Sequence, residues 1–224
     1  IKILLCCTFL FFSSINALQS KPFESTYQPL PAEKILITNA SIYDGDGNEF
    51  KNTDVLVQDG KIIAIGEDLP APEDFRIIDA TGKWVTPGII DIHSHMGVYP
   101  APGVRTSSDG NEATSPVTAD VWAEHSMWVQ DPQYALALTG GVTAFHVLPG
   151  SANLIGGRGV TVKNLQRTTI NSMKFPDAPH SLKMACGENP KRVYGNRGQA
   201  PSTRMGNAAG YRKSWIQAEG YLRK

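Results

Sequence analysis

The sequence predicts an α/β protein in which a small β-rich segment precedes a larger part built on parallel strands. Three observations predict this class. Short runs of β-branched residues separated by turn residues fill positions 35–79, and positions 84–92 form an apolar run without a polar face. A helix-like pattern over 119–138 is then followed by another apolar run at 142–148. Strands that alternate with a helix favour a parallel sheet over a hairpin.

The N-terminal residues 1–20 have the pattern of a secretory signal peptide. Lys2 precedes an apolar run over 3–12, which is short for a membrane span, and small residues follow up to Ala17. A retained membrane anchor is the alternative. Cleavage predicts an exported protein, periplasmic or extracellular, with no membrane contact afterwards. Residues 21–34, rich in Pro, Ser and Lys, are predicted to be a linker.

Residues 35–85 are predicted to form a small β-sandwich domain. Strands are expected at 35–38 leading into 41–43, and at 54–57, 61–65 and 76–79. Asp59-Gly60 separates two of them, and an Asp-Gly pair favours a tight hairpin because glycine accepts a positive φ. The domain is therefore expected to fold from local hairpins before the parallel part begins.

Composition indicates a globular domain that handles a small molecule. Apolar residues make up 41% of the chain, and 21 basic residues balance 21 acidic ones. This balance gives no electrostatic reason to expect nucleic acid as a partner. Cys186 would remain alone after loss of the leader, so no intramolecular disulfide is expected.

The most informative segment is Trp84–Met96, an apolar strand that follows Pro87-Gly88 and ends in two histidines. On a strand, His93 and His95 share a face at a backbone separation of roughly 6.5 Å. Two imidazoles so placed can reach one transition-metal ion. A polar strand end is the alternative, but the β-branched residues before the pair favour a strand buried on both faces.

This segment resembles the first barrel strand of the amidohydrolase superfamily of metal-dependent hydrolases, and the imidazolonepropionase-related group in particular. Gly141–Gly150 is similar to the second strand of that family. The resemblance implies a (β/α)8 TIM barrel, of which residues 86–224 would be the N-terminal part. It also implies hydrolysis of carbon–nitrogen bonds in amide-like, including cyclic, substrates by a metal-activated water, with His93 and His95 as ligands of one or two divalent ions, zinc being expected.

A complete barrel needs about 250 residues, more than residues 86–224 supply. We therefore expect a fragment whose barrel is truncated at the C-terminus and which is inactive alone. The general-base aspartate of the family would lie outside it. Homo-oligomerisation is left open. One alternative is an exported non-catalytic binding protein with a degenerate barrel, and another is a remnant of a truncated reading frame.

The resemblance also calls for a further ligand, which is a glutamate from the third strand or a bridging, carboxylated lysine. Glu188 is favoured over Lys183, because it follows the expected strand and ligands gather at the carboxyl ends of barrel strands. Asp91 is predicted to orient a ligand imidazole. Residues expected to line the substrate site or to support the ligands are His146, Asn153 and Arg192.

Overall fold

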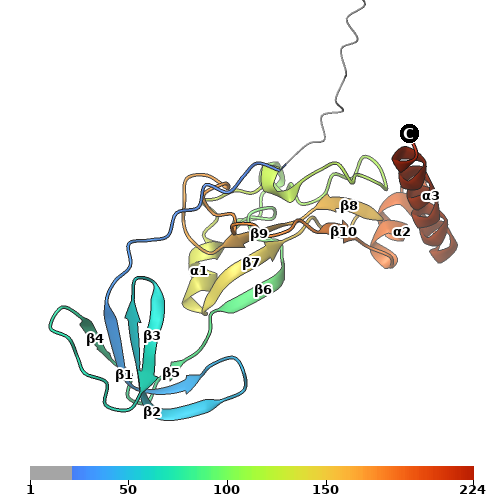
Figure 1. Ribbon diagram of the computed structural model, residues 1–224. Coiled ribbons are helices and arrows are strands. Elements are labelled where there is room, and N and C mark those ends of the chain that lie inside the picture. Colours follow the sequence, from blue (N-terminus) through green and yellow to red (C-terminus); the bar gives the residue numbers. More distant parts are fainter. Residues whose placement is uncertain (1–21) are drawn as a thin grey trace, which may run out of the picture.

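The structure, a computed structural model, describes residues 22–224 and has the mixed α/β class that the sequence predicts. Figure 1 shows a small sheet of β1–β5 beside a larger part that contains β6–β10 and the helices. The predicted signal peptide lies outside the described residues. No helix within residues 22–224 is both long and apolar enough to cross a bilayer.

The small sheet is organised around β1 (Ile35–Tyr43), which pairs with three other strands. The strands in chain order are β2 (Glu49–Gln58), β3 (Lys61–Gly66), β4 (Arg76–Asp79) and β5 (Trp84–Val85). β2 runs antiparallel to β1, whereas β4 and β5 run parallel to it. Asp59 and Gly60 have φ values of 52° and 71°, which confirms the predicted hairpin turn between β2 and β3.

The sandwich predicted for residues 35–85 is not confirmed, because the five strands form a single sheet. One face packs a small core of Ala40, Ile42, Val55 and Ala80. Other apolar side chains of the sheet are exposed, including Ile62 at 61% and Ile77 at 57%. The second sheet that a sandwich requires stays a prediction.

The larger part contains two small sheets. In one, β6 (Ile89–Ser94) pairs in parallel with β7 (Val142–Val147), as predicted, and β7 pairs antiparallel with β9 (Val160–Lys163). In the other, β8 (Ile155–Arg158) pairs antiparallel with β10 (Leu182–Met184). Tyr134 and Phe145 are fully buried in the core behind β7. The described residues do not close into a barrel.

The prediction that the strand before the histidines is buried on both faces is wrong for the described chain. Ile90 and Ile92 on β6 are 62% and 76% exposed. The reason is that no element of the described chain packs over these side chains. An apolar strand of this kind remains uncovered until another element packs on it.

The helix predicted over 119–138 is also wrong for most of its length. The structure has a 3₁₀ turn at Ala123–His125 and a short helix α1 (Gln133–Thr139). Asp131 interrupts the pattern, because its carboxylate accepts hydrogen bonds from the backbone N–H groups of Gly97 and Gln133. Pro132 then precedes α1, as proline favours a helix start. Two later helices are α2 (Glu188–Gly195) and α3 (Arg204–Leu222).

The segment 22–28, part of the predicted linker, packs against the larger part of the molecule. The Thr26 N–H donates to the Asn171 carbonyl at 2.9 Å, and Ser25 Oγ donates to the Lys174 carbonyl at 2.8 Å. We call residues 22–28 the strap. The strap is therefore attached to the fold by hydrogen bonds rather than being a free spacer.

Candidate metal centre

The centre is built at the carboxyl end of β6, where the sequence places its two histidines. The rings of His93 and His95 lie 5.2 Å apart between centroids and are nearly perpendicular, at 82°. Ser94 between them is buried with 4% exposure, so the strand turns the two imidazoles to the side opposite Ser94. The structure thus brings the two predicted ligand side chains together.

The Leu148 carbonyl determines which nitrogen of a neutral His95 ring carries the proton. His95 Nδ1 lies 2.8 Å from the Leu148 carbonyl oxygen, just after β7. A carbonyl only accepts, so Nδ1 carries the proton and a neutral ring presents a lone pair at Nε2. A histidine that binds a metal through one ring nitrogen usually donates a hydrogen bond from the other nitrogen to a carbonyl or carboxylate oxygen.

Lys183 on β10 reaches the same place from the other sheet. Its Nζ lies 3.0 Å from His93 Nε2, and the residue is only 8% exposed. Within residues 22–224 no carboxylate lies within ion-pair distance of this amine. Burial lowers the pKa of Lys183. The nearby Lys183 charge, and then burial, lower the pKa of His93. Lys183 Nζ can donate to His93 Nε2, so the contact favours a His93 ring that carries no proton on Nε2.

The structure reverses the preference for Glu188 over Lys183. Glu188 is the first residue of α2, its side chain is 79% exposed, and its nearest charged partner is Arg192 at 4.0 Å. The reason is that β10 ends at Met184 and the chain turns through Gly187 into a helix. Glu188 and Arg192 thus lie on the α2 surface, and only Lys183 of these residues contacts the histidine pair.

Two other predicted roles also change. Asp91 Oδ1 accepts a hydrogen bond from the His93 backbone N–H at 3.0 Å, so it holds the main chain and does not orient an imidazole. Asn153 is 1% exposed, and its amide donates to the Glu112 carbonyl and to Thr118 Oγ1. Its oxygen accepts from the Tyr194 hydroxyl. Asn153 is therefore a buried support of the loops, with no group free for a substrate.

His146 on β7 is held between two hydroxyl groups. Its Nδ1 lies 2.9 Å from Thr161 Oγ1 and its Nε2 lies 2.6 Å from Ser181 Oγ. Burial, more than any other cause, lowers the pKa of His146. Sequence reasoning did not single out Ser181, although its position two residues before Lys183 was an available signal.

A cavity of about 450 Å³ opens beside the centre. Its lining includes Pro149 and Gly156, and Gly156 packs close to the Lys183 side chain. Loop segments that follow β6 supply the opposite wall, including Val98 and Trp122. His93, His95 and Lys183 do not themselves line this cavity, which approaches the centre at Gly156.

The donor set fits a divalent cation. Within the described chain, residues 22–224, no group of three or more His, Cys, Asp and Glu side chains is placed to hold one ion. The cluster instead combines two imidazoles with a buried amine that lacks an anionic partner. Imidazole nitrogens suit zinc and its transition-metal neighbours. His93 and His95 would hold the ion, and Lys183 would join them only after its amine is converted to an anionic group.

Comparisons with known proteins find relatives that are named amidohydrolases. No protein-family model matches the chain. An amidohydrolase, tasK, from Hapsidospora irregularis is 39% identical over 183 residues, which cover 76% of this chain and 19% of that protein. A dihydropyrimidinase from Rattus norvegicus is 39% identical over 93 residues, which cover 40% of this chain and 17% of that protein.

A solved structure extends the similarity to the fold. The crystal structure of an amidohydrolase from Thermotoga maritima has a TM-score of 0.77 and 44% sequence identity, and the match covers 85% of this chain and 49% of that chain. The chain thus spans less than half the length of these relatives. On the evidence of these relatives, the chain belongs to the amidohydrolase superfamily.

Proposed function

We propose that the protein is a metal-dependent hydrolase that cleaves carbon–nitrogen bonds in small amide-like molecules, cyclic amides included. The single observation that carries the proposal is the position of Lys183 Nζ, buried and 3.0 Å from His93 Nε2 with His95 adjacent. Relatives named dihydropyrimidinase and dihydroorotase support the bond class. The finer grouping with imidazolonepropionase-related proteins stays a prediction.

In this proposal the chain's own residues hold one or two divalent ions, with zinc expected. His95 offers Nε2 because Leu148 holds its Nδ1 proton. The Lys183 amine, once deprotonated, would attack carbon dioxide and release one proton, and the resulting carbamate would be an anionic group able to help hold the ions. Such an ion, when bound, activates water and polarises the scissile carbonyl.

We further propose that β6 and β7 are the first two strands of a (β/α)8 barrel. Their parallel pairing and the free edge of β6 support this, because a closed barrel needs a neighbour on each side of every strand. The later strands would supply the general-base aspartate. Export after loss of residues 1–20 is also proposed, and fractionation of cells that express the full-length gene product tests it.

Metal analysis of the full-length gene product, purified with zinc and bicarbonate, tests the proposed function. We expect one or two zinc ions per chain and hydrolysis of small cyclic amides such as dihydropyrimidines or dihydroorotate. His93→Ala is expected to weaken zinc binding by more than about 100-fold, because removal of a ligand exceeds the usual cost of losing its support.

Lys51→Ala is the control. Lys51 lies on β2 of the small sheet, its side chain is 74% exposed and it lines neither the centre nor the cavity, so its variant should retain zinc and activity. A full-length wild-type protein that folds but binds no divalent ion, with or without bicarbonate, would overturn the proposal. A zinc site unaffected by His93→Ala would do the same.

A further inference from the structure

We propose that His146 is a positioning residue that, through Ser181, holds Lys183 against His93. The inference rests on the proposed function, because it assigns His146 a task at the same centre. His146 does not touch the ion or the substrate in this proposal. It determines where the Lys183 amine lies.

The two sides of the centre belong to different sheets. His93 lies on β6, in the sheet of β6, β7 and β9, whereas Lys183 lies on β10, which pairs only with β8 (Figure 1). β10 has three residues, and its register with β8 shifts between Lys183 and Met184. Backbone hydrogen bonds at Ser181 and Ala185 continue the pairing on both sides of Lys183. They hold the main chain of β10 to β8, so a side-chain contact with the other sheet is what could fix the amine 3.0 Å from His93 Nε2.

His146 provides that connection. On β7 it faces its cross-strand partner Thr161 on β9, whose hydroxyl is 2.9 Å from Nδ1. Nε2 lies 2.6 Å from Ser181 Oγ, across to the chain that enters β10. Ser181 and Lys183 are two residues apart, so in extended chain they share a face. Fixing the Ser181 side chain therefore also fixes the direction in which Lys183 projects.

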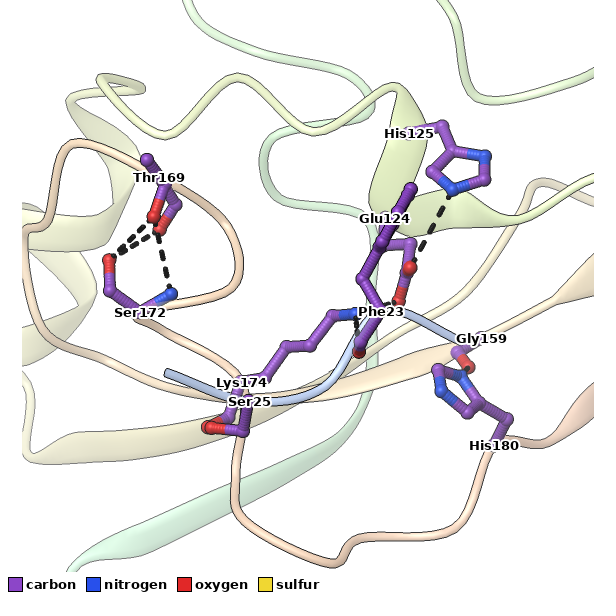
Figure 2. Close-up of polar contacts among 9 residues, drawn as sticks. All are labelled: Phe23, Ser25, Glu124, His125, Gly159, Thr169, Ser172, Lys174 and His180. Atoms are coloured by element: carbon purple, nitrogen blue, oxygen red, sulfur yellow. Dashed lines mark hydrogen bonds and ion pairs between the residues drawn. The ribbon is translucent and has the colours of Figure 1, made fainter. Parts of the chain in front are cut away.

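Close packing at Gly159 supports a fixed position for Ser181. The Gly159 N–H donates to the Ser181 carbonyl, and His180 Nδ1 lies 2.8 Å from the Gly159 carbonyl (Figure 2). A Cβ atom at Gly159 would lie 2.6 Å from Ser181 Oγ and 3.0 Å from the Val147 carbonyl. Glycine is thus required for this approach, and any side chain there would push Ser181 away from His146.

The contacts of His146 also exclude direct ligation. Both ring nitrogens are engaged by hydroxyl groups, so neither has a lone pair directed at the ion or a substrate. A residue that supports a ligand at one remove typically contributes 10- to 100-fold to metal affinity, by order of magnitude. That range is the expected size of the effect here.

The experiment compares the full-length wild type with Ser181→Ala, Ser181→Thr and His146→Ala. Co²⁺ affinity is followed by visible absorption, and carboxylation of Lys183 by the carbamate signal in ¹³C NMR with labelled bicarbonate. We expect Ser181→Ala and His146→Ala to weaken Co²⁺ binding about 10- to 100-fold and to reduce the carbamate signal. Ser181→Thr keeps the hydroxyl and should restore both. Ser172→Ala, on an exposed loop whose serine bonds only to Thr169, is the matched control and should behave as the wild type (Figure 2).

The outcomes separate the two proposals. If Ser181→Ala retains wild-type Co²⁺ affinity and a full carbamate signal, the positioning role is wrong while the hydrolase proposal stands. If the wild type itself takes up no Co²⁺ and gives no carbamate signal, the proposed function fails and the positioning role with it. Should His146→Ala not fold, the two Ser181 variants still decide the question.

Discussion

Two buried lysines, Lys174 and Lys183, show opposite solutions to the same electrostatic problem. Lys174 is 4% exposed, lies 2.7 Å from Glu124 Oε2, and donates to the Phe23 carbonyl at 2.6 Å (Figure 2). Lys183 is 8% exposed and has a histidine but no carboxylate beside it in the described chain. A buried ammonium costs several kcal/mol unless it is paired.

The presence of a carboxylate partner distinguishes the structural lysine, Lys174, from Lys183. Lys174 has a carboxylate and a carbonyl partner, and it joins the strap to the 3₁₀ turn at Ala123–His125. Lys183 has no carboxylate partner in the described chain, and burial lowers its pKa. A lysine whose pKa is lowered by burial suits a chemical role better than a lysine held in an ion pair, so we propose that role for Lys183.

The largest effect is expected when the buried ion pair between Glu124 and Lys174 is broken. Glu124→Gln or Lys174→Met should each lower the free energy of unfolding by about 3–5 kcal/mol, because each leaves one buried charge without its partner. Urea denaturation of the metal-free protein measures this. The double variant Glu124→Gln/Lys174→Met should lose less than the sum, since no isolated charge remains. Additive losses would show that the two groups are not coupled.

The next prediction applies the same substitution to the other lysine. Lys183→Met should leave the metal-free protein as stable as the wild type, or more stable by up to about 1 kcal/mol, because an unpaired buried amine is replaced by an apolar chain. The stabilisation that zinc gives the wild type should disappear. Thermal denaturation with and without zinc measures both quantities. A loss as large as that of Lys174→Met would mean that Lys183 is a structural residue.

Much of the fold was predictable because its signals are local. The Asp59-Gly60 turn joins two strands that are adjacent in sequence. β6 and β7 are distant in sequence, but the apolar run that marks each strand is local. The prediction of a helix over 119–138 was wrong because of a contact between residues distant in sequence. Asp131 bonds to the backbone N–H of Gly97, 34 residues earlier, and this contact is not visible in a helical pattern.

In the candidate site, too, the local part was predictable and the contacts between distant segments were not. His93 and His95 are close in sequence, and strand geometry alone places them together. Whether Lys183 or Glu188 joins them depends on where β10 ends, which involves pairing with β8 and a turn at Gly187. The contact between His146 and Ser181 spans 35 residues and two sheets, so no sequence spacing could indicate it.

A smaller effect is expected where the strap meets Lys174. Ser25 Oγ donates to the Lys174 carbonyl at 2.8 Å, and the Tyr27 N–H donates to the same hydroxyl at 3.1 Å. Ser25→Ala should therefore cost about 1 kcal/mol of unfolding free energy, the usual net value of such hydrogen bonds. Faster hydrogen exchange confined to the strap and residues 171–174 would accompany it. Unchanged exchange there would show that the strap does not depend on Ser25.

The smallest effect is expected at Tyr134, which tests whether burial without a polar partner is by itself the mark of a functional group. Tyr134 is fully buried, its hydroxyl has no hydrogen-bond partner, and burial raises its pKa above the usual value. Its group is neutral at pH 7, so burial costs far less than for an ammonium, and Tyr134→Phe should change stability there by about 1 kcal/mol or less. Above about pH 10 the unfolded phenol ionises while the native one does not, so wild-type stability should fall with rising pH. Urea denaturation at pH 7 and pH 11 should show this extra loss in the wild type and not in Tyr134→Phe. An equal loss in the two proteins would mean that the phenol ionises in the native state too, and that its burial is incomplete.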